Sequence, residues 1–228
     1  MVAQSPKDLV PMFFDNTAKT YDKISVWATF GKDRYWKKMI VSKIRHADNI
    51  LDLACGTGIL TRKVAVKFPK ADVKGVDITK SYLDVAQKNS LQFSNISFIH
   101  QDAENLNLDE KFDCICSSYI PKYADPKTLV KTCVSHLKPD GVIVLHDFTY
   151  PRNIFIQTLW GMYFVLLGFV GNFIPAWKEA FVGLPKLIRS SMWVDDYRQE
   201  LQLKGFDVKQ TSLTWHSSVI LVARQQQK

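Results

Sequence analysis

From residue 49 onward, short apolar runs alternate with longer stretches that have helical periodicity. The apolar runs are unbroken rather than alternating, which is typical of parallel strands buried on both faces. The runs expected to be strands are NILDLAC (49–55), ADVKGVDI (71–78), ISFIH (96–100), FDCICSS (112–118) and GVIVLHDF (141–148). The stretches expected to be helices between them are ILTRKVAVKF (59–68), SYLDVAQKNS (81–90) and PKTLVKTCVSHL (126–137).

This alternation predicts right-handed crossovers and a doubly wound, Rossmann-like α/β sheet. Near the end of the chain, GFDVKQTSLTW (205–215) and SSVILVARQ (217–225) lie close together, as the strands of an antiparallel pair do. We therefore expect seven strands, mostly parallel, with an antiparallel C-terminal pair. The chain would form one domain over 1–228, with a helical cap over 1–45 that is rich in Lys, Arg, Trp and Tyr.

The most hydrophobic stretch, residues 153–177, reads NIFIQTLWGMYFVLLGFVGNFIPAW and follows the fifth expected strand. Its length would cross a bilayer, since a spanning helix needs about 20 mostly apolar residues. A single span would leave the last two strands beyond the membrane, where they could not complete the sheet and their backbone groups would lose partners. The glycines of this stretch and Pro175 favour two short helices with a bend.

The composition is that of an ordinary globular protein, with 228 residues of which 46% are hydrophobic and 23% charged. A net charge of +8 and a pI of about 9.2 favour contact with phospholipid headgroups, nucleic acid or an acidic ligand. The four cysteines are spaced neither as a zinc knuckle nor as a disulfide framework. We expect free thiols in a reducing, cytoplasmic compartment, because the N-terminal sequence also lacks the pattern of a signal peptide.

The strongest candidate for chemistry is LDLACGTGILT (51–61), where a strand runs into Gly56, Thr57 and Gly58 and then into a helix. Such glycines let the backbone approach a ligand closely, and the helix N-terminus offers free amides. Thr61 stands where a dinucleotide fingerprint would have its third glycine, which disfavours an NAD-dependent oxidoreductase.

Acidic residues end the next two expected strands. Asp77 closes the second strand, 19 residues after Gly58, where a carboxylate can accept both ribose hydroxyls of a nucleoside. Asp102 follows the third strand in HQDAENL (100–106) and is placed to accept from an adenine amino group, while Ala103 offers its amide. The alternatives are a plain loop carboxylate at Asp77 and a side-chain turn cap at Asp102.

Taken in order, LDLACGTGILT, VDIT, QDAENL and LKPDG resemble the class I S-adenosylmethionine-dependent methyltransferases. More narrowly, ATFGKDRYWKK (28–38) is similar to the segment before the glycine motif in the UbiE/MenG type, the C-methyltransferases of ubiquinone and menaquinone biosynthesis. FFDNTAKTYDKIS (13–25) and FVGLPKLIRSSMWVDDYRQELQLKGF (181–206) resemble the start and the later part of the same family. The resemblance covers most of the chain and implies S-adenosylmethionine as the cofactor.

The resemblance also implies roles for single residues. Asp77 would hold the ribose, and Asp102 and Ala103 would meet the adenine. Tyr21 and Arg34 would close the site from the N-terminal helices, although Arg34 fits a plain surface arginine equally well. The cofactor-binding residues that the resemblance implies, with no metal, are Tyr21, Arg34, Asp52, Gly56, Thr57, Gly58, Thr61, Asp77, Ile78, Asp102, Ala103 and Ser117.

The chain departs from the family pattern after the fourth strand. The quinone enzymes usually show a Gly-Leu-Arg-Asn run there, but this chain reads SSYIPKY (117–123), with Pro121 and, as the nearest cation, Lys122. If the family's arginine polarises an aromatic acceptor, this difference puts a quinone in doubt and leaves another lipid as an alternative acceptor.

A phenolic or carbon acceptor must lose a proton, which requires a nearby base. His146 and Asp147 end the fifth strand, at the edge where open α/β sheets bind ligands, and His146 has a near-neutral intrinsic pKa. Successive strand residues alternate in direction, so we expect at most one of them to reach the substrate. A structural hydrogen bond is the alternative for His146, and Tyr150 and His216 are weaker catalytic candidates.

We expect residues 151–195 to form a hydrophobic insertion that covers the substrate or touches a membrane. Its aromatic residues suit a long-chain acceptor or insertion into one leaflet, and the positive charge favours adsorption to anionic lipid. These aromatic residues are Trp160, Tyr163, Phe164, Phe169, Phe173 and Trp177. The expected location is therefore peripheral to a membrane, with a buried cap, a homodimer contact and a true span as alternatives.

The favoured function is S-adenosylmethionine-dependent methylation of a hydrophobic, membrane-associated acceptor, with a polyprenylated quinone precursor first. The alternatives are N-methylation of an ethanolamine phospholipid, O-methylation of a small molecule, and a non-catalytic scaffold that binds nucleic acid or membrane. Nucleic acid is disfavoured, because SSYIPKY is unlike the Asn-Pro-Pro-Tyr-like motif of base methyltransferases and most Lys and Arg residues are scattered.

Overall fold

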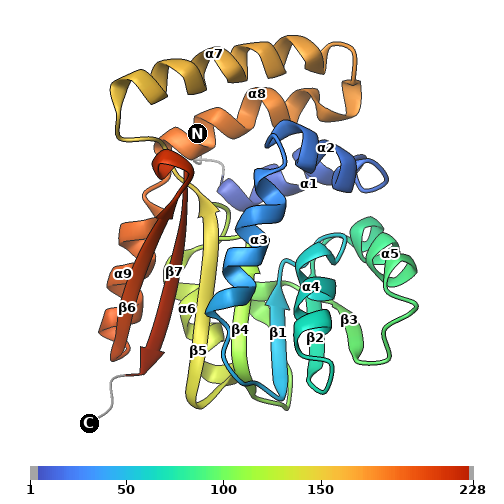
Figure 1. The fold of residues 1–228 in the computed structure, drawn as a ribbon, viewed down its shortest axis with the longest axis vertical. Helices are drawn as coiled ribbons and strands as arrows, with labels where there is room; N and C mark the ends of the chain where they lie inside the picture. Colours follow the sequence, from blue (N-terminus) through green and yellow to red (C-terminus); the bar gives the residue numbers. More distant parts are fainter. Residues whose placement is uncertain (1–4, 226–228) are drawn as a thin grey trace.

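One seven-stranded sheet with the order β3-β2-β1-β4-β5-β7-β6 forms the centre of the molecule (Figure 1). The structure is a computed structural model that describes residues 5–225. The strands are β1 (Asn49–Leu53), β2 (Asp72–Asp77), β3 (Ile96–His100), β4 (Phe112–Ser118), β5 (Leu137–Phe148), β6 (Phe206–Leu213) and β7 (Ser218–Gln225). Strands β1 to β5 pair in parallel, and β7 pairs antiparallel with both β5 and β6. The predicted sheet, including its antiparallel C-terminal pair, is confirmed.

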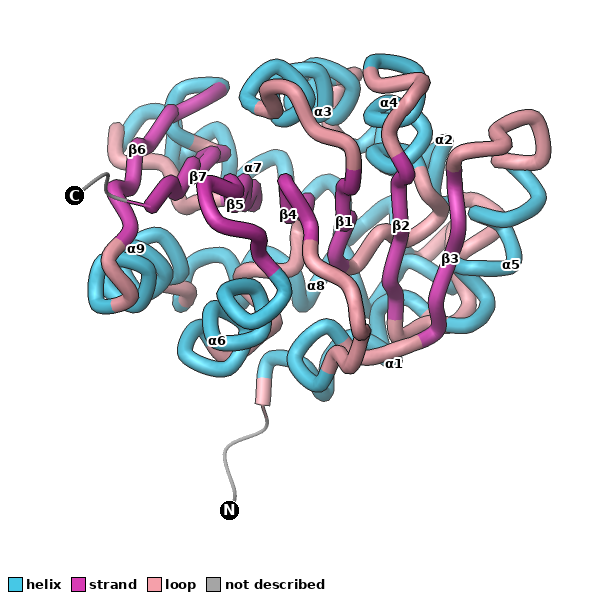
Figure 2. Tube along the Cα trace, turned by 90° about the horizontal axis from the view of Figure 1, so that it is seen from below, coloured by secondary structure: helices cyan, strands magenta, loops and turns pink. Residues whose placement is uncertain are grey.

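Helices cover both faces of the sheet and the edge at which the parallel strands end (Figure 1). Figure 2 shows α3 and α4 over one face and α6 and α9 over the other. The α-helices are α1 (Leu9–Phe14), α2 (Tyr21–Ala28), α3 (Lys32–Lys43), α4 (Ile59–Lys67), α5 (Lys80–Asn89), α6 (Pro126–His136), α7 (Ile154–Gly171), α8 (Pro175–Ser190) and α9 (Trp193–Leu203). Short 3₁₀ helices are η1 (Pro6–Asp8), η2 (Ala103–Asn105) and η3 (Thr214–His216).

The two faces of each central strand enter two different cores. On β1, Ile50 packs in the core beneath α3 and α4, whereas Leu51 packs in the core beneath α6 and α9. On β4, Cys114 and Cys116 belong to the first core and Ile115 to the second. All four cysteines of the chain are buried free thiols, as expected. Because helices cover both faces, the central strands have apolar residues on both faces, which is the pattern that predicted them.

A third core joins the N-terminal helices to the hydrophobic insertion. Phe13 of α1 packs with Trp177 of α8, and the Trp177 indole N–H donates to Thr20 Oγ1 at 2.9 Å. The Tyr163 hydroxyl of α7 donates to the carbonyl of Ala28 in α2. The N-terminal cap and the insertion therefore form one layer over the carboxyl ends of the strands (Figure 1).

Helix α7 is one uninterrupted helix of 18 residues, so the expectation of two short helices with a bend inside this stretch was wrong. Gly161 and Gly168 do not end the helix, although each costs about 1 kcal/mol of helix propensity relative to alanine. The chain turns only after Gly171. A Cβ on Gly171 would lie 3.1 Å from the Cα of Lys178 in α8. Glycine thus allows α7 and α8 to approach closely, and α8 begins at Pro175, which suits the first turn of a helix.

Within residues 5–225, α7 is the helix that is long and apolar enough to cross a membrane, with a mean hydropathy of 1.8 and 11% of the stretch buried. Strands β6 and β7 follow it and complete the sheet beside β5. Helix α8 returns along α7, so that α7 lies across the end of the molecule rather than projecting from it (Figure 1). This arrangement agrees with the argument that a single span conflicts with the fold.

A methyl group at position 183 has no room in this packing. A Cβ on Gly183 of α8 would overlap the ring of Phe13, which is buried in the third core. We expect Gly183→Ala to lower the free energy of unfolding by about 1–3 kcal/mol through overpacking. Thermal unfolding measures this effect. Gly161→Ala is the matched control, because its Cβ would meet only Arg189 at 3.6 Å and alanine favours the helix. Equal melting temperatures for the two variants would contradict this packing of α1 on α8.

Candidate active site

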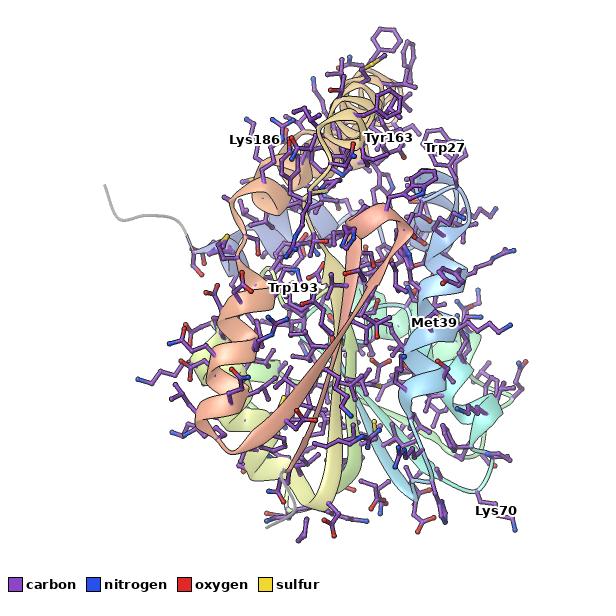
Figure 3. All side chains as sticks on the ribbon, turned by 60° about the vertical axis from the view of Figure 1, so that its left-hand side comes forward. Trp27, Met39, Lys70, Tyr163, Lys186 and Trp193 are labelled. Atoms are coloured by element: carbon purple, nitrogen blue, oxygen red, sulfur yellow. The ribbon has the colours of Figure 1, made fainter. Side chains whose placement is uncertain are left out.

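A cavity of about 520 Å³ opens at the carboxyl ends of the strands. It lies where the strand order reverses between β1 and β4, which is where open α/β sheets bind ligands. Its floor is the glycine loop with the ends of β2, β4 and β5, and its roof is α1, α2, α7 and α8. Figure 3 shows Tyr163 and Trp27 at this end of the molecule and Lys70 at the opposite end.

Six of the predicted cofactor-binding residues line this cavity, namely Tyr21, Gly56, Asp77, Ile78, Asp102 and Ala103. One carboxylate oxygen of Asp77 accepts from the Gly56 amide and the other from the Thr79 amide, both at 2.8 Å. Gly56 has a φ of +57°, a conformation that glycine adopts at little cost. Burial raises the pKa of Asp77, and the two amides oppose this shift. Each carboxylate oxygen keeps a lone pair that could accept a hydroxyl group.

Asp102 takes part in a network at another side of the cavity. Its Oδ1 accepts from the Glu104 amide at 3.0 Å, and its Oδ2 accepts from Asn105 Nδ2 at 2.8 Å and from Lys7 Nζ at 2.5 Å. Burial opposes ionisation, but the hydrogen bond from Lys7 and the bonds beside it lower the pKa of Asp102 overall. The turn cap that was the alternative for Asp102 is therefore present, and the same carboxylate also lines the cavity.

Three predicted cofactor contacts, Arg34, Gly58 and Ser117, are placed away from the cavity lining. Arg34 is exposed on α3. Ser117 is fully buried and donates to the Leu53 carbonyl at 2.5 Å, so that it fastens β4 to β1. Gly58 has a φ of +75° just before α4, and a Cβ there would lie 3.1 Å from the ring of Phe98.

Thr57, also predicted as a cofactor contact, holds the N-terminal cap instead. Its hydroxyl donates to Asp22 Oδ1 at 2.5 Å, and Arg62 Nη2 lies 3.5 Å from Asp22 Oδ2. Asp22 could not be singled out from the sequence, because its partners lie 35 and 40 positions further along the chain. The contact attaches the first turn of α2 to the glycine loop.

Asp52 and Thr61 form a buried pair beneath the glycine loop. Thr61 donates to Asp52 Oδ2 at 2.7 Å, and neither residue lines the cavity. Within residues 5–225, Asp52 Oδ1 has no hydrogen-bond partner. Burial raises the pKa of Asp52 to about 7, although the bond from Thr61 opposes this shift.

The catalytic candidates His146 and Asp147 are fully buried and do not line the cavity. The ring nitrogens of His146 lie 3.1 Å from Ser118 Oγ and 2.7 Å from Ser218 Oγ, and burial lowers its pKa well below the usual value. These contacts correspond to the alternative of a structural hydrogen bond. Asp147 accepts from the Lys122 ammonium at 2.7 Å, so its role is that of a counter-ion.

The weaker candidates also lie outside the cavity lining. The rings of Tyr150 and Trp160 pack edge to face with their centroids 5.2 Å apart. The guanidinium carbon of Arg189 lies 5.3 Å from the centroid of the Tyr150 ring. His216 is exposed, although its neighbours Trp215 and Ser217 line the cavity. None of these four titratable candidates is brought to the cavity wall.

Two cavity-lining residues from the divergent run SSYIPKY were not predicted to act, namely Tyr119 and Lys122. Tyr119 has a φ of +81°, which is uncommon for a residue with a side chain. Its ring stacks on Phe148 at 4.9 Å and its hydroxyl donates to Asp33 at 2.7 Å. The departure from the family pattern was the signal that could have directed attention to these residues.

Residues 1–220 match the model of the ubiE/COQ5 methyltransferase family. The chain belongs to this family. The sequence-based identification of an S-adenosylmethionine-dependent methyltransferase of the UbiE type is thereby confirmed.

Curated members of the family match this chain over almost the whole of their own length. The ubiquinone/menaquinone biosynthesis C-methyltransferase UbiE of Campylobacter jejuni is 28% identical over 219 residues, which cover 90% of this chain and 92% of that protein. The demethylmenaquinone methyltransferase of Chlorobaculum tepidum is 27% identical over 234 residues, which cover 98% of this chain and 95% of that protein.

Solved structures share the fold at lower identity. The plantazolicin methyltransferase BpumL, solved with a substrate analogue and S-adenosylhomocysteine, has a TM-score of 0.68 at 14% identity and covers 97% of this chain and 95% of its own. Magnesium protoporphyrin IX methyltransferase from Synechocystis, solved with bound S-adenosylmethionine, has a TM-score of 0.61 at 17% identity and covers 99% of this chain and 100% of its own. At these identities the comparison supports the architecture alone.

The buried carboxyl of Asp52 predicts a dependence of stability on pH. Its pKa is about 7 in the folded chain against an ordinary value of 3.8, so the folded state binds more protons between these values. The contribution of Asp52 therefore destabilises the fold as the pH rises from about 4 to about 7. Asp52→Asn removes this titration, and the free energy of unfolding of the variant relative to wild type should increase over that range, by about 4 kcal/mol at most.

Urea unfolding between pH 4 and pH 8 measures this difference. Asp48→Asn, at an exposed carboxylate just before β1, is the control. If the stability difference between Asp52→Asn and wild type stays constant with pH, the carboxyl of Asp52 is not held protonated by burial.

Proposed function

We propose that this protein transfers a methyl group from S-adenosylmethionine to a prenylated quinone precursor at a membrane surface. The observation that carries the proposal is the continuity of one cavity from the glycine loop and Asp77 to the apolar inner side of α7. The names of the relatives from Campylobacter jejuni and Chlorobaculum tepidum, which state ubiquinone or menaquinone biosynthesis, support a quinone precursor as the acceptor.

The residues around one end of the cavity fit S-adenosylmethionine. Asp77 would accept the ribose hydroxyls through its remaining lone pairs, and Ala103 would meet the adenine beside Asp102. When bound, S-adenosylmethionine supplies a methyl group on a positively charged sulfur.

The other end of the cavity fits an apolar chain. Its walls are hydrophobic and aromatic side chains from α7 and α8, namely Ile156, Leu159, Trp160, Tyr163, Phe164, Leu167, Trp177, Ala180, Phe181 and Leu184. Because the donor is already activated, alignment of the acceptor and exclusion of water supply most of the acceleration. These walls perform both tasks, since they hold a hydrophobic acceptor in a fixed direction and contain few groups that bind water.

The outer side of α7 supports a membrane-facing position. Hydrophobic residues on this helix and the following turn are strongly exposed, namely Ile154, Phe155, Met162, Val165, Leu166, Phe169 and Phe173. Exposed lysines and arginines lie beside them at Arg152, Lys178, Lys186 and Arg189. An apolar helix face with basic neighbours suits adsorption to one leaflet of an anionic membrane. A lipid acceptor could then enter the cavity past the same helix without crossing water.

The cofactor assignment predicts the effect of removing the carboxylate at position 77. Asp77→Ala should weaken S-adenosylmethionine binding about 100-fold, because two hydroxyl acceptors and the fixed position of the Gly56 amide are lost. Calorimetric titration of the purified chain measures the affinity. Asp72→Ala, at the exposed start of the same strand, should bind as wild type does. Unchanged affinity in Asp77→Ala would remove the cofactor assignment.

The membrane assignment predicts a charge effect that is confined to α7. Val165→Glu places a carboxylate on a side chain that is 76% exposed, and Val66→Glu places one at a 68% exposed position on α4. Sedimentation with vesicles that contain anionic phospholipid should show about tenfold weaker binding for Val165→Glu. Binding should be unchanged for Val66→Glu. Equal binding of both variants would mean that adsorption involves another face.

A further inference from the structure

We infer that Lys122 receives an oxygen of the acceptor and stabilises it as an oxyanion, so that the acceptor is a compound with an ionisable ring hydroxyl. This inference rests on the proposed function and specifies the chemistry of the acceptor within it. It concerns a residue of the run SSYIPKY, which stands in place of the Gly-Leu-Arg-Asn run of the quinone enzymes.

Lys122 is a buried cation in the cavity wall. Its side chain is only 1% exposed, and its Nζ donates to Asp147 Oδ1 at 2.7 Å and to the Tyr119 carbonyl at 3.0 Å. An ammonium group has three N–H donors. The third has no acceptor among residues 5–225, which leaves it available to an oxygen in the cavity.

Aromatic rings surround this ammonium. Its Nζ lies 4.4 Å from the ring centroid of Tyr123, 5.4 Å from that of Tyr119 and 5.5 Å from that of Phe148. All three rings belong to residues that line the cavity. A flat aromatic acceptor could therefore lie against these rings with its oxygen directed at the ammonium.

Asp147 is the buried counter-ion of Lys122. Burial lowers the pKa of Lys122, and the carboxylate of Asp147 opposes this shift. The carboxylate does not line the cavity, and its oxygens also accept from the amides of Lys122 and Phe148 at 3.0 and 2.7 Å. Lys122 thus lines the cavity, whereas its counter-ion Asp147 lies behind it. A bound anion requires this orientation.

The backbone around Lys122 is fixed in an uncommon conformation. Tyr119 has a φ of +81°, which other contacts must hold in place. Stacking on Phe148 and the hydrogen bond to Asp33 provide these contacts. As a result, the Tyr119 carbonyl faces the ammonium and fixes its position relative to the cavity.

The other cations of the cavity wall are less suited to this role. Among the described residues, the lysines that line the cavity are Lys7, Lys32 and Lys122. Lys7 is engaged by the carboxylates of Asp102 and Glu104, and Lys32 is exposed on α3. The attraction between a cation and an anion is much stronger where water is excluded than at an exposed position.

The role of Lys122 in methyl transfer can be written step by step. The ring hydroxyl of the acceptor releases its proton to water, and Lys122 stabilises the oxyanion that remains. The neighbouring ring carbon then forms a bond to the methyl carbon while the carbon–sulfur bond breaks and sulfur keeps its electron pair. Finally, the proton on that ring carbon moves through water to the oxygen, which restores the hydroxyl and the aromatic ring.

A nitrophenol that carries an alkyl chain tests this oxyanion site without any methyl transfer. Its phenolate is coloured, so absorbance titration of the complex with the full chain reports the pKa of the bound hydroxyl. We expect that pKa to be at least about one unit lower than in water, a tenfold change in ionisation. Lys122→Arg should keep the shift, because it keeps the charge.

The matched loss-of-charge variant is Lys122→Met with Asp147→Asn, since removing the lysine alone would leave Asp147 as an uncompensated buried charge. In this double variant, S-adenosylmethionine binding should be unchanged and the pKa of the bound nitrophenol should be at or above its value in water. An unchanged low pKa in the double variant would overturn the inference.

A measurement on wild type alone keeps the inference testable if the double variant does not fold. The affinity for the nitrophenol should rise as the pH passes through the pKa of the probe, whereas the affinity for its methyl ether should stay constant. The titratable and charged groups nearest to the site are Asp147 and His146 on β5, Tyr119 and Tyr123 beside Lys122, and Asp33 and Lys37 on α3. The methyl ether corrects for their titration.

An affinity for the nitrophenol that falls on ionisation would reject the oxyanion site. By contrast, a lowered pKa of the bound probe together with no methylation of any demethylated quinol would reject the proposed function and leave the oxyanion site in place. The two failures are therefore distinguishable.

Discussion

The hydrogen bond from the Gly56 amide to the Asp77 carboxylate ties the first crossover of the sheet to the end of the neighbouring strand. The Thr79 amide fixes the other carboxylate oxygen, so Asp77 is held at the end of β2, beside β1. Tyr82 lies against Gly56 and its hydroxyl is 2.6 Å from that of Thr17, which connects this loop to the N-terminal cap. The cofactor end of the cavity is thus formed by the fold itself, and the acceptor end is built onto it.

Helix α7 is hydrophobic on all sides. A helix of this kind is ordinarily buried in a core or in a membrane. Here one side of α7 faces the cavity and α8, and the remaining side is exposed. The fold therefore accounts for the hydrophobicity of the inner side, and the proposed contact with lipid would account for that of the outer side. The length and composition of the helix would suit a span, but the strands that follow it complete the sheet beside β5.

The sheet could be predicted from the sequence because both faces of its central strands are buried. Such strands appear in the sequence as short apolar runs with clear ends. The position of Asp77 beside the glycine loop could also be predicted, since the loop follows one strand and Asp77 ends the neighbouring strand. Contacts between distant segments could not be predicted. Asp22 with Thr57, Lys7 with Asp102 and the buried position of His146 all depend on how the cap and the last strand pack. Thr61 beside the glycine loop and Ser117 at the end of β4 were expected to touch the cofactor, yet both are buried and donate to Asp52 and to the Leu53 carbonyl.

The departure at SSYIPKY raises doubt about a quinone acceptor, because the Gly-Leu-Arg-Asn run of the quinone enzymes is absent. In the structure, Lys122 of this run lines the cavity, and its side chain is buried against Asp147. The sequence could not reveal this, since the burial of Lys122 depends on Asp147 in another strand and on the left-handed backbone at Tyr119. The proposed oxyanion contact would give this divergent run a chemical role in the same cavity.

The central claim is that one cavity joins the donor to a lipid acceptor with an ionisable ring hydroxyl. The most direct measurement is to incubate the purified protein with S-adenosylmethionine labelled in its methyl group and a total membrane lipid extract, and to identify the labelled product by mass spectrometry. The account predicts label on the ring of a prenylated quinol. Label on an ethanolamine headgroup, or no labelled lipid although S-adenosylmethionine binds, would contradict it.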